Sequence, residues 1–273
     1  MDSGLKDIFG PGKIGVGVLH LAPLPGSPGF AGDQDAVRDR ALHEAEILAS
    51  AGYDGLIIEN YGDLPFLKAS VGRATIDAMS AIAEEVKASV GIHIGVNVLR
   101  NDYRASLAIA AACGCEFVRI NILVGAYVTP EGLIEGRPGE VLRLRKQMAP
   151  GVRIFADVRV KHAYPLAATT IDEDALDVAE RGKADYLIVT GARTGSPPSA
   201  EELRAGGLSL NKARLNVPVL VGSGITPSNV ADFLRLSDGF IVGSYIRKDG
   251  RAGERIEFEK ARELTKIKES VEG

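Results

Sequence analysis

Ionisable side chains suited to proton transfer occur where apolar segments of this chain end. They are two histidines, two carboxylates and a lysine. Histidine and carboxylate side chains can act as general acids or bases near neutral pH. A lysine whose pKa is depressed by desolvation can form a Schiff base with a carbonyl compound, or it can simply hold a phosphate. The candidate catalytic residues are therefore Lys161, Glu59, Asp157, His20 and His162.

Structural roles compete with catalysis at these positions. The period-two alternation of a strand places Asp157, Arg159 and Lys161 on one side, where Lys161 could pair with Asp157 or Glu59 and only close the fold. A lone histidine is more often a structural hydrogen-bond donor. Glu59 and Asp157 could also form a carboxylate pair for proton transfer or bind a divalent cation. The sequence contains neither of the zinc-binding motifs HxH and HExxH. Whether the site binds a metal ion therefore stays open, and no organic cofactor is expected.

Two glycine-serine turns near the C-terminus, VGSGI at 221–225 and IVGSY at 241–245, each follow a short apolar segment. Glycine has no Cβ, so such backbone can approach an anion closely. In a (βα)8 barrel the loops after the last two strands bind phosphate, together with a helix N-terminus. After the first turn, Thr226 and Pro227 are expected to begin that helix. Ordinary strand-to-helix turns are the alternative. The predicted phosphate-binding residues are Gly222, Ser223, Gly224, Gly243 and Ser244.

Further polar side chains follow the other apolar segments, where they would surround a bound substrate. Side-chain amides and hydroxyl groups can both donate and accept hydrogen bonds. Arg193 lies in a glycine-rich segment and suits an anionic substrate, although it could also be a surface charge. The predicted substrate-binding residues are Asn60, Asn97, Arg100, Asn121, Thr190 and Arg193.

The elements that must position these residues alternate along the whole chain. Apolar, β-branched segments predict buried parallel strands, and segments with helical periodicity separate them. Eight strands favour a closed α/β barrel, the (βα)8 or TIM fold. The GxGxxG motif of a dinucleotide-binding sheet is absent after the first strand, which argues against that alternative. We expect a single barrel domain over 13–273, preceded by a short helix or lid at 1–12. The predicted strands cover 14–19, 55–59, 92–98, 117–122, 153–158, 185–190, 217–221 and 239–242.

Length and composition agree with one barrel. The 273 residues match the usual size of about 250, and long connections at 22–34 and 125–137 are expected at the face that carries the active site. A net charge of −4 gives no basic field for nucleic acid. No apolar stretch approaches the roughly 18 residues of an integral membrane segment. Cys113 and Cys115 are too close for a disulfide, which suits a cytoplasmic protein, and barrels often form homo-oligomers.

Eight segments carry a resemblance to a known family: VLHLAPLPGSP, IIENYGDLPF, GVNVLRND, TPEGLIEGR, ADVRVKHAYPL, VTGARTGSPPS, VGSGI and DGFIVGSYIRKDG. Together they resemble the BtpA/SgcQ family, over about residues 14–250. The resemblance implies a barrel of the ribulose-phosphate-binding kind. It also associates the chain with members in photosynthetic bacteria that are linked to photosystem I accumulation as peripheral membrane proteins, and with SgcQ-type members in a sugar-metabolism setting.

These observations predict an enzyme that acts on a small phosphorylated sugar or nucleoside-derived metabolite, as an isomerase or an aldol-type lyase. Lys161 would stabilise an enolate or form an imine, Glu59 or Asp157 would move a proton, and His20 would assist. The alternative is a non-catalytic assembly or stability factor of the photosystem I biogenesis type.

Overall fold

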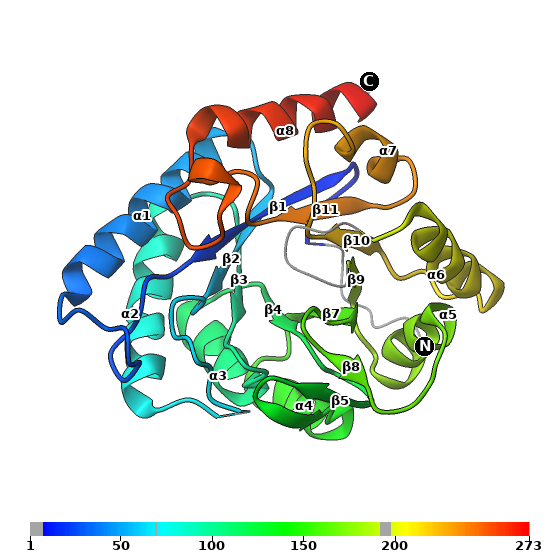
Figure 1. Ribbon diagram of the computed structural model, residues 1–273, viewed down its shortest axis with the longest axis horizontal. Helices are drawn as coiled ribbons and strands as arrows, with labels where there is room; N and C mark the ends of the chain where they lie inside the picture. Colours follow the sequence, from blue (N-terminus) through cyan, green and yellow to red (C-terminus); the bar gives the residue numbers. More distant parts are fainter. Residues whose placement is uncertain (1–7, 69, 192–197, 273) are drawn as a thin grey trace.

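Eight parallel strands close into a barrel, which confirms the predicted fold (Figure 1). The computed structural model describes residues 8–68, 70–191 and 198–272. Around the barrel the order is β1-β11-β10-β9-β7-β4-β3-β2. The strands are β1 (Ile14–His20), β2 (Gly55–Glu59), β3 (His93–Asn97), β4 (Phe117–Ile120), β7 (Arg153–Arg159), β9 (Tyr186–Thr190), β10 (Val219–Gly222) and β11 (Gly239–Val242).

These segments form strands because both of their faces are buried. One face packs on the surrounding helices and the other fills the barrel interior, so the sequence reads as continuous apolar runs. Phe117 and Phe155 stack inside the barrel with their ring centroids 4.4 Å apart. Phe9 packs edge-on against both rings and closes the N-terminal end of the barrel. Residues 8–12 form bends without a helix, and residues 1–7 of the expected lead helix lie outside the described part.

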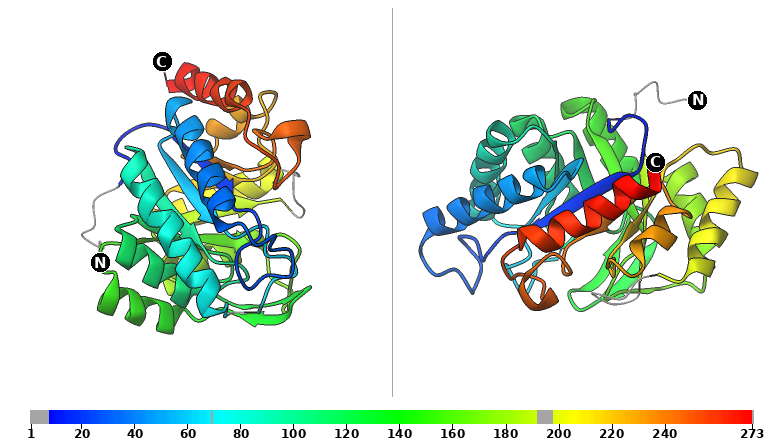
Figure 2. Two further views of the ribbon diagram at one scale, coloured as in Figure 1. Left: turned by 90° about the vertical axis from the view of Figure 1, so that its left-hand side faces the viewer. Right: turned by 90° about the horizontal axis from the view of Figure 1, so that it is seen from above.

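Helices form an outer layer around the strands, as Figures 1 and 2 show. Apolar faces explain this position: α1 turns its buried alanines and leucine toward the barrel. Ser199 and Glu202 form a capping box at the start of the helix that begins at Ala200. The helices are α1 (Gln34–Ser50), α2 (Arg73–Ser89), α3 (Tyr103–Cys113), α4 (Pro138–Met148), α5 (Ile171–Leu176), α6 (Ala200–Lys212), α7 (Val230–Leu234) and α8 (Phe258–Glu272). Within the described residues, no helix combines the length and the apolar character needed to cross a membrane.

A small antiparallel sheet, which the sequence analysis did not predict, follows β4. Its order is β6-β5-β8, with β5 (Ala126–Thr129), β6 (Gly132–Glu135) and β8 (Tyr164–Pro165). The segment at 125–137 is therefore a hairpin and not an irregular connection. Thr129 Oγ1 donates to the carbonyl oxygen of Gly132 across the turn, at 2.8 Å. Because β5 follows β4 and β8 follows β7, this sheet lies at the C-terminal end of the barrel.

Candidate active site

A pocket of about 440 Å³ lies at the C-terminal ends of the barrel strands. This is the end at which (βα)8 barrels build their active sites. Its wall is made by the ends of β1 and β2, by β4, and by the loops after β3, β7, β10 and β11. The pocket brings together ten of the predicted site residues: His20, Glu59, Arg100, Asn121, Lys161, His162, Ser223, Gly224, Gly243 and Ser244.

Arg119 on β4 links the two predicted carboxylates. Its Nη2 donates to Asp157 Oδ1 at 3.0 Å and to Oδ2 at 3.2 Å, and its Nη1 lies 3.9 Å from Glu59 Oε2. Burial opposes the charge of Arg119, but the nearby Asp157 and Glu59 outweigh it and raise the pKa of the guanidinium. Asp157 also accepts from Asn121 at 2.7 Å and does not line the pocket. Asp157 therefore anchors Arg119 and Asn121, while Glu59 faces the pocket.

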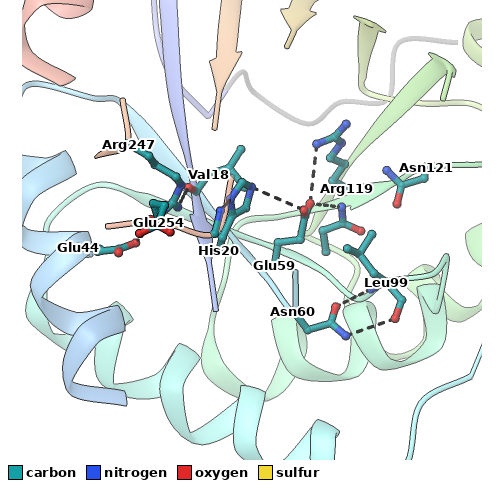
Figure 3. A network of polar contacts seen from close by, with 12 residues as sticks. Val18, His20, Glu44, Glu59, Asn60, Leu99, Arg119, Asn121, Arg247 and Glu254 are labelled. Carbon is teal, nitrogen blue, oxygen red and sulfur yellow. Dashed lines mark hydrogen bonds and ion pairs between the residues drawn. The ribbon is translucent and has the colours of Figure 1, made fainter. Parts of the chain in front are cut away.

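Glu59 lies at the centre of the network in Figure 3. Asn97 Nδ2 donates to Glu59 Oε2 at 2.8 Å, and Oε1 is 3.9 Å from His20 Nε2. Asn97 is almost completely buried and does not reach the pocket. The predicted substrate-binding residue Asn97 therefore positions the carboxylate of Glu59.

His20 is held as a neutral imidazole in one tautomer. Burial lowers its pKa well below the usual value, and the charges of Arg247, Lys161, Arg119 and Arg40 lower it further. Its Nδ1 accepts from the backbone N–H of Gly253 at 3.2 Å, so the proton is on Nε2 and faces Glu59.

The imidazole also stacks on Tyr61, with ring centroids 4.3 Å apart. The Nε2–H group of His20 is therefore oriented to polarise a carbonyl oxygen, as a neutral imidazole can.

Lys161 follows β7 and lines the pocket. Burial and the adjacent Arg119 lower its pKa to about 8, against the opposing effects of Glu59 and Asp157. Its ammonium group forms no ion pair within 4.0 Å among the described residues, so the alternative role, an ion pair with Glu59 or Asp157, is not found there. At pH 7 about a tenth of the molecules carry a neutral amine at this position, which is the nucleophilic form.

A β-bulge in β7 corrects the prediction for Arg159. The register against β9 shifts between Asp157 and Arg159, so strict alternation fails there. Arg159 Nε donates to Asp174 Oδ2 on α5 at 2.7 Å and does not line the pocket. Asp157, Arg159 and Lys161 therefore do not share one side.

Two other predicted substrate-binding residues serve the backbone. Asn60 accepts from the N–H of Leu99 at 2.7 Å and donates to its carbonyl oxygen at 3.3 Å (Figure 3). Thr190 Oγ1 donates to the carbonyl oxygen of Arg159 at 2.6 Å. Neither residue lines the pocket, and Arg193 lies outside the described residues.

Asn121 does face the pocket, and one of its polar atoms is unsatisfied. Its Nδ2 donates to Asp157, which fixes the orientation of the amide. Its Oδ1 is buried without a hydrogen-bond partner in the structure. A buried acceptor in this state calls for a donor from a ligand or a water.

The two glycine-serine turns present fewer backbone N–H groups to the pocket than the five predicted residues would supply. The N–H groups of Gly224, Gly243 and Ser244 have no acceptor in the part of the chain that the structure describes, and all three residues line the pocket. The N–H of Ser223 donates to the carbonyl oxygen of Ile241 at 3.3 Å. Gly222 belongs to β10, where a Cβ would come within 2.6 Å of a side chain on β9. Gly222 thus permits close strand packing.

The helices after these turns also differ from the prediction. α7 has only five residues and begins at Val230, with Asn229 and not Thr226 at its N-cap. Asn229 accepts from the N–H of Thr226 and donates to the carbonyl oxygen of Gly224, which holds the intervening turn. After β11 the next α-helix is α8, which begins at Phe258. Among the described residues, backbone amides of the turns therefore face the pocket, and no long helix begins directly after either turn.

A model of the BtpA family matches residues 12–270. The chain belongs to the BtpA family. The photosystem I biogenesis protein BtpA of Synechocystis sp. is 42% identical over 242 residues, which are 89% of this chain and 83% of that protein.

Two solved structures resemble this BtpA-family barrel. Thiamine phosphate pyrophosphorylase from Pyrococcus furiosus has a TM-score of 0.57 at 17% identity, covering 96% of this chain and 97% of the other. Phosphoribosyl anthranilate isomerase from Thermus thermophilus has a TM-score of 0.60 at 12% identity, covering 94% and 99%. At these identities the likeness establishes the fold alone.

Sequence reasoning missed a buried arginine that supports the site of this BtpA-family protein. Arg247 is completely buried; its Nη1 donates to Glu44 Oε2 at 3.0 Å and its Nη2 to the carbonyl oxygen of Val18 at 2.7 Å (Figure 3). It fixes the start of the loop that carries Gly253, the donor to His20. Nothing in IVGSYIRKDG distinguishes this arginine from a surface residue. Arg119 could have been found, because a charge inside an apolar strand indicates a function.

Proposed function

We propose that this BtpA-family protein is an enzyme that acts on a small phosphorylated sugar or nucleoside-derived metabolite, as an isomerase or an aldol-type lyase. One observation carries the proposal: Lys161, with its pKa lowered to about 8, shares a pocket with Glu59 and His20. Perturbed lysines of this kind are typical of Schiff-base chemistry. The names of the two structural relatives also refer to phosphorylated compounds.

The phosphate would bind at the turns after β10 and β11. Three backbone N–H groups there lack acceptors among the described residues, and amides of this kind form anion-binding concavities. Among the described residues that line the same pocket, Arg100, Arg119 and Lys161 stand against one acidic side chain, that of Glu59. Three cations against one carboxylate favour an anionic substrate.

The amine of Lys161 would attack the carbonyl carbon of the substrate. A C–N bond forms and the carbonyl oxygen gains a proton. The Nε2–H of His20 assists by polarising the carbonyl group. Loss of water then leaves an iminium ion. This cation draws electrons from a bond on the adjacent carbon. If Glu59 removes a proton there, delivery of a proton from water to the opposite face of the same carbon restores the iminium ion with that centre inverted, which is an isomerisation. If a C–C bond breaks, Glu59 takes the proton of the hydroxyl group on the departing carbon, an aldehyde leaves, and the enamine that remains is protonated again. In both cases water then hydrolyses the iminium ion and releases the product.

Reductive trapping tests this proposal. The protein is mixed with ribose 5-phosphate, ribulose 5-phosphate or glyceraldehyde 3-phosphate and then with borohydride, which reduces an imine to a stable secondary amine. Peptide mass spectrometry should locate a saturable adduct on Lys161, absent in Lys161→Met and retained in Lys146→Met, where Lys146 is an exposed residue of α4. If Lys161 is labelled no faster than surface lysines by every one of these compounds, the proposal is wrong.

A non-catalytic role in assembly is the second candidate, favoured by the name of the Synechocystis relative. Its test is thermal stabilisation by inorganic phosphate and by the same sugar phosphates. A pocket that has lost catalysis and ligand binding would give no shift with any of them, whereas the enzyme should be stabilised by mass action.

A further inference from the structure

The pocket has both polar and apolar lining. Its polar groups lie at the ends of β1 and β2, on β4, at the turns after β10 and β11, and in the loops after β3 and β7, which carry Arg100, Lys161 and His162. Four apolar side chains of the lining follow β2, β3 and β7, and we call them the apolar wall. It consists of Leu64, Phe66, Leu99 and Val160.

Barrel topology places one part of the apolar wall, Leu99, across from the turn after β10, which belongs to the proposed phosphate seat. In the ring of eight strands, β3 stands four positions from β10 and therefore opposite it. Leu99 follows β3, Leu64 and Phe66 follow β2, and Val160 follows β7. Lys161 directly follows Val160, and Glu59 ends β2, the strand that precedes Leu64 and Phe66. A substrate with its phosphate at the turns and its carbonyl at Lys161 would direct its remaining atoms toward the apolar wall.

Part of the apolar wall is left uncovered by the protein. Leu99 and Val160 are buried, but Leu64 is 54% exposed and Phe66 is half-buried. Covering such surface with an apolar group is favourable in proportion to the area removed from water. The pocket volume of about 440 Å³ also falls in the range of about 300–1,000 Å³ that holds drug-sized ligands, so there is room for more than a sugar phosphate.

Arg100 provides a flat cationic surface beside the apolar wall. Its guanidinium is buried next to the apolar wall, and Nε has no hydrogen-bond partner; the nearest carboxylate oxygen, Glu131 Oε2, is 3.7 Å away. Nη2 donates to the carbonyl oxygen of Lys161 at 2.8 Å, which fixes the plane of the side chain. A planar guanidinium stacks on flat rings of a ligand. The aromatic ring of Phe66 can also stack on such a ring.

We propose that the substrate carries a single flat six-membered ring in addition to its phosphate, and that this ring binds on the apolar wall between Phe66 and Arg100. The inference rests on the proposed function, because the phosphate seat sets the orientation of the substrate. It narrows the substrate class from sugar phosphates in general to phosphorylated sugars that bear a heterocyclic base or an aryl group.

Calorimetric titration of the full chain with three probes tests the proposal. Ribose 5-phosphate carries only the phosphate end, uridine carries only the ring end, and uridine 5′-monophosphate carries both. The wild-type protein should bind uridine 5′-monophosphate about tenfold or more tightly than either of the other two. Phe66→Ala should weaken binding of uridine 5′-monophosphate about tenfold and leave the affinity for ribose 5-phosphate within about twofold.

Leu67→Ala is the matched control, because Leu67 is an exposed residue of the same loop that does not line the pocket. Its affinities should equal those of the wild type. Leu64→Ser, at an exposed position, repeats the test without risk to the core. Equal affinity of the wild type for ribose 5-phosphate and uridine 5′-monophosphate would overturn the ring site and leave the proposed function standing. Equal affinity for uridine and uridine 5′-monophosphate, without binding of ribose 5-phosphate, would instead overturn the phosphate seat.

Discussion

Lys161→Met should make the protein more stable at neutral pH. The fold lowers the pKa of Lys161 from 10.5 to about 8. The charged ammonium is therefore less stable in the folded protein than in the unfolded chain, and this difference lowers the free energy of unfolding. Each tenfold change in the dissociation constant corresponds to about 1.4 kcal/mol. At pH 7 the cost is therefore about 3 kcal/mol, and methionine removes it while filling a similar volume.

The sign of the pH dependence follows from the same pKa. Between pH 8 and 10.5 the unfolded chain binds more protons than the folded one, so the stability of the wild type rises with pH. The advantage of Lys161→Met should fall to about 2 kcal/mol at pH 9 and nearly vanish above pH 10.5. Below pH 8 the advantage should be almost constant.

Urea unfolding of both proteins from pH 7 to 10.5 measures this difference. Lys146→Met is the control, because Lys146 is exposed on α4 and surface substitutions change stability by about 0.5 kcal/mol or less. Equal stability of the wild type and Lys161→Met at pH 7 would refute the reasoning. A difference that stayed constant up to pH 10.5 would refute it as well, because packing and not charge would then be its cause.

Three further predictions concern residues that support the pocket. Arg247→Met should lower the free energy of unfolding by about 3 kcal/mol, because Glu44 loses a buried partner; urea unfolding should show part of the loss recovered by adding Glu44→Gln. Gly222→Ala should cost about 1–3 kcal/mol in the same assay, because its Cβ would come within 2.6 Å of a β9 side chain, whereas Gly91→Ala, with nothing within 4 Å, should be close to neutral. The His20 imidazole should stay neutral below its usual pKa, with Nε2 protonated; nitrogen NMR chemical shifts through pH 6 measure this, and a protonated ring at pH 6 would contradict it.

The barrel could be predicted because its signal is local and repeated. Each strand is buried on both faces, so eight apolar runs stand out between amphipathic helices, and the errors at strand ends are one or two residues. The antiparallel sheet gave no such signal. β8 has only two residues, Tyr164 and Pro165, and it is a strand only because it pairs with β5, about 40 positions earlier in the chain. The homo-oligomer and the cytoplasmic location stay predictions.

The sequence could predict which residues lie at the strand ends, but not which of their polar atoms face the pocket. Ten predicted residues line one pocket, because the C-terminal ends of parallel strands meet at one face of a barrel. Which atoms remain for a ligand depends on partners that the sequence does not reveal. Asn60, Asn97 and Thr190 use their polar atoms on the protein itself, and the register shift after Asp157 turns Arg159 away from the pocket.

The competition for Asp157 explains why Lys161 is suited to nucleophilic chemistry. Arg119 and Asn121 both donate to Asp157, so this carboxylate is engaged below the pocket and makes no contact ion pair with the lysine. Burial has the largest effect on the pKa of Lys161, and the positive charge of Arg119 lowers it further. Arg119 thus engages Asp157, one of the carboxylates that could have paired with Lys161, and it also favours the neutral amine. Part of the cause of the lowered pKa of Lys161 therefore lies on a different strand, β4.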